Sequence, residues 1–224
     1  MTIAHDCYPF LPDKFAATVS PYVEALKHGP DGYSKLRSAA LTLFDNDSNV
    51  RRLVSDYGGW NKRTLEAEPP ETTPGFWLML FLYAHFFTVT QKEPSLNVPL
   101  STVAWVARLA GWSKDDVATL NQGKHSFKDF ARQWLFEELG DNPQSIPDFW
   151  NHFHPESTLG HLGWLNVADI RNLLKAMSAL EPTIANMNLG DSDPNKILRH
   201  FACVKNVFQG AVENDYCLCV VTSA

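Results

Sequence analysis

Hydrophobic residues recur every three or four positions along much of the chain, which is the spacing of one face of a helix. The pattern is clearest in two segments, 167–180 and 195–213. In the second, the recurring residues are Ile197, Phe201, Val204, Phe208 and Ala211. We predict further helices over 13–28, 34–45, 48–57, 102–110, 114–122 and 127–139.

The segment 76–89 is the most apolar of the chain, and only His85 and Thr88 interrupt it. Its 14 residues are too few to cross a bilayer, which takes about 20. A helix that is apolar on all sides is buried on all sides. The sequence therefore predicts a mainly α fold: a compact bundle of about eight to ten helices around a buried central helix at 76–89, with a small β element in the C-terminal third.

The predicted β element is the segment 216–222, a run of cysteine, leucine and valine that favours a strand. A lone strand would leave its backbone N–H and C=O groups unpaired, so it needs a neighbour. We predict that the irregular stretch 157–164 is that neighbour.

For the domain organisation, we expect one compact domain over 1–224. The alternative is a soft boundary near 141–148, in a stretch rich in proline. It would separate a helical bundle (1–145) from an α+β subdomain (146–224).

Two of the predicted helices begin with the same pattern. An apolar residue precedes a good N-cap residue, and an aspartate lies three positions beyond the cap. This pattern predicts a hydrophobic staple and a capping box. The residues are Trp112, Ser113 and Asp116 in one helix, and Leu165, Asn166 and Asp169 in the other.

The charge narrows the range of partners. The formal net charge is −6, and the only adjacent basic pairs are Arg51-Arg52 and Lys62-Arg63. Because phosphate groups are bound by clustered cationic side chains, we expect neither nucleic acid nor an anionic membrane as a partner. An acidic surface is compatible with a basic protein partner.

The four cysteines, Cys7, Cys203, Cys217 and Cys219, are too few for a small disulfide scaffold, so we expect reduced thiols. Residues 1–14 show neither a basic region nor a long apolar run, so no signal peptide is predicted. We therefore expect a cytoplasmic location.

One cluster has residue types that bind metals. His152, His154, Glu156 and His161 lie within ten residues, and imidazole and carboxylate groups are ligands for zinc, iron or nickel. The spacing resembles the His-x-His and Glu of cupin barrels. However, Glu156 follows His154 by only two residues and the chain lacks the many short strands of a cupin, so we infer no cupin function. A divalent metal at this cluster is one hypothesis, and the absence of any cofactor is the expectation beside it.

The sequence contains no nucleophile elbow, phosphate-binding loop, dinucleotide fingerprint or HExxH motif. The first functional hypothesis is therefore a cytosolic protein-interaction module that binds and inhibits or neutralises another protein. Immunity proteins and small anti-defence proteins of phages are similar to it in general character. We expect exposed aromatic residues rimmed by acidic ones at the interface. The candidates are Trp60, Glu66, Glu68, Glu71, Asp141, Asp148 and Trp150.

Two alternatives belong to other classes. One is a metal-dependent enzyme in which the histidine cluster holds a metal that activates water. The other is a helical small-molecule binder with a pocket around Trp77 and His85. The sequence predicts no oligomeric state.

Overall fold

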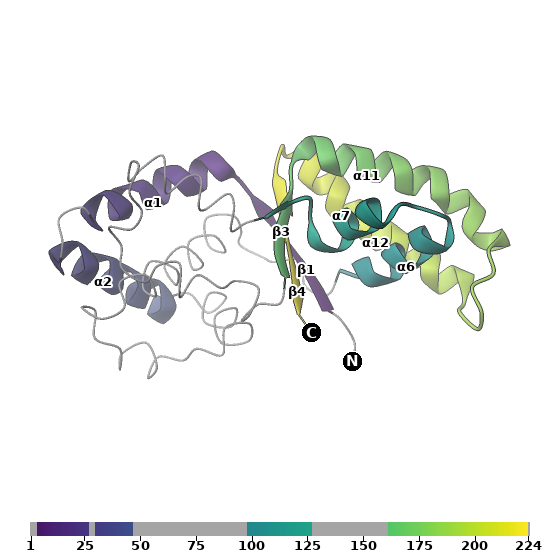
Figure 1. The fold of residues 1–224 in the computed structure, drawn as a ribbon, viewed down its shortest axis with the longest axis horizontal. Helices are drawn as coiled ribbons and strands as arrows, with labels where there is room; N and C mark the ends of the chain where they lie inside the picture. The colour runs from purple at the N-terminus through teal and green to yellow at the C-terminus, as the bar shows by residue number, and fades with distance from the viewer. Residues whose placement is uncertain (1–3, 27–29, 47–97, 127–160, 224) are drawn as a thin grey trace. The chain divides into compact units, whose positions relative to one another are not determined.

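The computed structural model describes residues 4–26, 30–46, 98–126 and 161–223 (Figure 1). The chain divides into two compact units, of which the first comprises Met1–Phe10, Glu93–Phe127 and Gly160–Ala224. The second comprises Leu11–Lys92 and Lys128–Leu159. The proposed boundary near 141–148 lies outside the described residues, and the prediction of a single domain stays a prediction.

The first unit contains a four-stranded antiparallel sheet in the order β1-β4-β3-β2. Its strands are β1 (Ala4–Phe10), β2 (His125–Ser126), β3 (His161–Leu165) and β4 (Cys217–Ser223). The edge strand β1 pairs with β4, with Tyr8 opposite Cys219, so the sheet joins segments that lie far apart in the sequence. The apolar strand β4 thus finds partners for its backbone on both sides.

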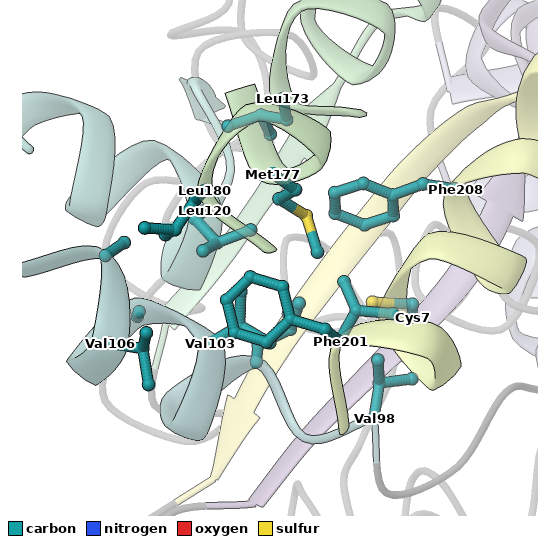
Figure 2. Close-up of a cluster of buried hydrophobic side chains, with 14 of the residues drawn as sticks. Cys7, Val98, Val103, Val106, Leu120, Leu173, Met177, Leu180, Phe201 and Phe208 are labelled. Atoms are coloured by element: carbon teal, nitrogen blue, oxygen red, sulfur yellow. The ribbon is translucent and has the colours of Figure 1, made fainter. Parts of the chain in front are cut away.

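The helices of the first unit lie together on one side of this sheet (Figure 1). They are α6 (Leu100–Leu109), α7 (Lys114–Gln122), α11 (Val167–Leu180), the 3-10 helix η2 (Glu181–Asn186) and α12 (Pro194–Glu213). The five apolar residues predicted to share one face of α12 are all buried. Figure 2 shows part of the core that these helices form with the sheet, where Phe201 and Phe208 of α12 lie near Met177 of α11 and Cys7 of β1.

In the second unit, the structure describes two helices, α1 (Pro12–Leu26) and α2 (Pro30–Asn46), which pack against each other. They overlap the predicted helices 13–28 and 34–45. Among the described residues, no helix is both long enough and apolar enough to span a membrane.

The predicted bundle of about eight to ten helices is wrong, because the described residues form a four-stranded antiparallel sheet beside the helices. The strands other than β4 give weak sequence signals: β1 contains Pro9, β2 has two residues, and β3 contains Gly163. The predicted strand 216–222 is confirmed, and its expected partner 157–164 overlaps β3. The predicted central helix at 76–89 lies outside the described residues.

The predicted start of α11 is confirmed. The backbone N–H of Asp169 donates to Asn166 Oδ1 at 2.8 Å, and the Asp169 carboxylate accepts from the Asn166 N–H at 3.2 Å, which completes a capping box. At the start of α7, the N–H of Asp116 donates to Ser113 Oγ at 3.1 Å, as predicted. There, however, the carboxylate accepts from the Ser113 hydroxyl at 2.6 Å.

Candidate functional site

A groove of about 500 Å³ lies between α7 and α11 in the first unit. This volume is in the range of ligand-binding pockets, about 300–1,000 Å³. One side of the groove is formed by α7 and by the turns before and after it. Its lining residues there are Gly111, Trp112, Ser113, Asp116, Thr119 and Lys124. From α11 they are Asp169, Asn172, Leu173 and Ala176.

The turn between α6 and α7 places Trp112 at the groove. Gly111 adopts a positive φ of 86°, and its N–H donates to the Arg108 carbonyl at 3.1 Å. The N–H of Trp112 donates to the Ala107 carbonyl at 3.0 Å. This pair of bonds is the Schellman motif, in which the residue after the glycine packs back onto the helix. Trp112 accordingly packs against the core while it lines the groove.

At the other end of α7, the backbone passes very close to β3. Gly123 adopts a φ of 79°, and a Cβ there would lie 2.5 Å from the Trp164 backbone nitrogen. A Cβ at Gly163 would collide with the carbonyl oxygen of Gln122. Both Gly123 and Gly163 must therefore be glycine, because a side chain at either position would collide with the other segment's backbone. The approach brings Lys124 and His125 next to the start of α11.

The buried carboxylate of Asp169 joins these segments. Its side chain is only 5% exposed, and Oδ1 accepts from Lys124 Nζ at 2.9 Å. Oδ2 lies 2.7 Å from His125 Nε2. The His125 ring packs against Trp164, with ring centroids 4.7 Å apart. One carboxylate thus caps α11 and links it to the segment that follows α7.

Burial alone would raise the pKa of Asp169, but the hydrogen bonds from Lys124, His125 and the Asn166 backbone outweigh it, and its pKa is lowered. Asp169 is therefore ionised at neutral pH. Both of its oxygens are engaged by the protein, so it serves as a structural anion at the edge of the groove.

The other polar groups of the groove are more available. Asp116 is exposed, and within the described residues its carboxylate accepts a hydrogen bond from the Ser113 hydroxyl. The side chain of Asn172 is exposed and makes no hydrogen bond within the described part of the chain. Lys124 is 57% exposed and keeps N–H groups beyond the one that Asp169 accepts. The groove therefore offers a carboxylate, an amide and an ammonium to a ligand.

A second feature lies on α6. Trp105 and Leu109 are 39% and 49% exposed, and they are the large hydrophobic residues that the described part of the chain leaves exposed. They are four positions apart in the helix, so they share one face. The opposite face of α6 is buried in the core through Val103, Val106 and Ala107.

Of the metal cluster predicted from the sequence, the described residues include only His161, which lies on β3 opposite Thr222. His152, His154 and Glu156 lie outside them. In the described ranges, no group of three or more potential metal ligands occurs. The metal site therefore stays a prediction.

The predicted interface residues, Trp60, Glu66, Glu68, Glu71, Asp141, Asp148 and Trp150, also lie outside the described residues. So do Trp77 and His85 of the predicted pocket. The groove itself was missed, because Lys124 and His125 are far from Asp169 in the sequence and meet it only through the pairing of β2 with β3. The available signal was the capping motif, which marked both Asp116 and Asp169 but not their proximity to one groove.

Comparisons with protein-family models, with curated proteins and with solved structures find no match to this chain.

Proposed function

We propose that this chain is a protein-binding module and that the exposed face of α6 is part of its interface. The observation that carries the proposal is the pair Trp105 and Leu109, one turn apart on the solvent side of a helix whose other side is buried. Tryptophan is enriched among the residues that dominate binding energy at protein interfaces. An exposed apolar pair on a rigid helix is a suitable anchor for a partner.

The charge supports a partner with a basic surface. The chain carries a net charge of −6, and Asp115 and Asp116 are exposed in the first turn of α7, the next helix after α6. Acidic residues near an apolar anchor raise the association rate with a basic partner and select against an acidic one. Inhibition of that partner, expected from the sequence, is part of the same proposal.

The test is quantitative capture of the tagged full chain's partner from its native host. The double variant Trp105→Ala/Leu109→Ala is expected to lose a co-purifying protein that the original chain retains. Lys196→Ala is the control, because Lys196 is an exposed residue on α12. Once identified, the partner's activity is measured with and without the chain, and inhibition is expected.

Equal capture by the original chain and the double variant would contradict the proposal. Sedimentation of the purified chain supplies the check on self-association. If the pair instead joins two copies of this chain, the original protein will sediment as a dimer and the double variant as a monomer.

A further inference from the structure

We propose that the groove between α7 and α11 holds a short basic segment of the protein partner, with an arginine or lysine side chain placed at Asp116 and Trp112. This inference rests on the proposed protein-binding function and specifies the chemistry of the partner. It concerns the groove and not the apolar pair on α6, so the two can be tested separately.

The charge of the groove favours a cation. Its ionisable lining residues are Asp116, Lys124 and Asp169. Lys124 and Asp169 form an ion pair at 2.9 Å, which neutralises both. The charge that remains is that of Asp116, which is exposed and whose carboxylate accepts a hydrogen bond from the neutral Ser113 hydroxyl. A cationic side chain is the natural counterpart of this carboxylate.

The aromatic residue beside this carboxylate favours the same ligand. Trp112 precedes Ser113, the cap of α7, and lines the groove together with Asp116. A guanidinium or ammonium group is attracted to the face of a tryptophan ring, and arginine also stacks on it. A carboxylate and an indole in the lining of one groove therefore favour an arginine or lysine over an acidic residue.

The rest of the groove can bind the partner's peptide segment on either side of this arginine or lysine. Leu173 and Ala176 of α11 provide an apolar wall, and the amide of Asn172 offers a donor and an acceptor to a peptide backbone. The nine residues of α7, which borders the groove, span about 13 Å. An extended stretch of four residues reaches about the same length. The occupant is therefore a short extended segment.

The experiment uses the full chain and two blocked peptides, acetyl-Ala-Leu-Arg-Leu-Ala-amide and the same peptide with glutamate in place of arginine. Backbone amide NMR shifts are recorded during titration to millimolar peptide. We expect shifts at 111–119 and 172–176 with the arginine peptide and none with the glutamate peptide. Asp116→Asn is expected to weaken binding about twofold to fivefold, the effect of losing one exposed ion pair.

A pair of matched variants tests whether the peptide binds in the groove. Ala176→Arg places a long cation in the groove and is expected to abolish binding. Ala179→Arg adds the same charge to the same helix at an exposed position that does not line the groove, and it is expected to leave binding unchanged.

Absence of shifts with the arginine peptide, equal binding of the two peptides, or equal behaviour of the two arginine variants would each overturn the inference. If the Trp105→Ala/Leu109→Ala variant still loses the partner in that case, the proposed protein-binding function stands and only the assignment of the groove fails.

Discussion

The starts of α7 and α11 carry the same residue pattern in two different environments. In each helix an apolar residue precedes the N-cap, and an aspartate occupies the third helical position. Asp169 of α11 is 5% exposed and is held by Lys124, His125 and the Asn166 backbone. Asp116 of α7 is exposed and bonds only within its own helix start, as far as the described residues show.

The difference shows that a capping motif determines where a helix begins but not what its carboxylate does. Asp169 has a structural role because Lys124, which is distant in the sequence, donates a hydrogen bond to its carboxylate. Asp116 meets no such segment among the described residues, and it faces a groove that can accept a ligand. The same capping motif thus provides a carboxylate that stabilises the fold in α11 and a carboxylate that is free to contact a ligand in α7.

The largest expected effect concerns the glycines at the two ends of α7. Gly123→Ala forces a non-glycine residue into a left-handed conformation and also collides with the Trp164 backbone. We expect a loss of about 3 kcal/mol in the free energy of unfolding. Gly111→Ala meets no atom within 4 Å, so it incurs only the conformational cost, about 1 kcal/mol. Urea unfolding followed by circular dichroism measures both, and equal losses would contradict the close approach at Gly123.

The second expected effect is a difference in stability between variants of Asp169 and Asp116. Asp169→Ala removes a buried acceptor from several donors, and we expect it to lower the free energy of unfolding by about 2 kcal/mol. Asp116→Ala removes an exposed acceptor, and we expect a loss of about 0.5 kcal/mol. The same urea titrations check the prediction. If both substitutions had the same effect, the distinction between a structural and an available carboxylate would be wrong.

The third effect is a pH dependence that follows from the lowered pKa of Asp169. In the unfolded chain this carboxyl has its ordinary pKa of 3.8, so its contribution to stability is fully present well above that value. As the pH falls through 3.8 towards the lower folded pKa, the unfolded state binds the proton first and stability is lost. We expect Asp169→Asn to flatten this part of the curve of unfolding free energy against pH, and a curve as steep as that of the original chain would contradict the assignment to Asp169.

A smaller effect at higher pH comes from His5. This residue is 2% exposed, its Nδ1 has no hydrogen-bond partner within the described residues, and burial lowers its pKa. When the pH falls below the ordinary pKa of 6.5, His5 binds a proton in the unfolded chain but stays neutral in the folded chain. The free energy of unfolding therefore declines as the pH falls. His5→Leu is expected to remove this decline while the steeper loss below 3.8 remains. A decline that persists in the variant would contradict the assignment to His5.

Helices and their ends could be predicted from the sequence because their signals are local. The predicted ranges 114–122 and 167–180 match α7 and α11, and the buried face of α12 was predicted residue by residue. Strands β1 and β2 were missed, because β2 has only two residues and the pairing of β1 with β4 joins segments far apart in the sequence. The strand signals of β1 and β3 are weakened by Pro9 and Gly163.

For the site, the sequence marked Asp116 and Asp169 as capping residues but gave no sign that they line one groove. That relation depends on the β2–β3 pairing and on the close approach of Gly123 to Trp164. Trp105 and Leu109 could not be distinguished from core residues either, because their apolar character is the same and only the packing of α6 exposes them.

The most direct test of the protein-binding function is site-specific photo-crosslinking in the native host. A photoreactive amino acid is placed at Trp105 on the exposed face of α6 or, as the control, at Arg199, an exposed position of α12. We predict one covalent adduct with another protein from position 105 and none from position 199. Identical adduct patterns from the two positions, or no adduct from position 105, would contradict the proposal that this face of α6 binds a partner.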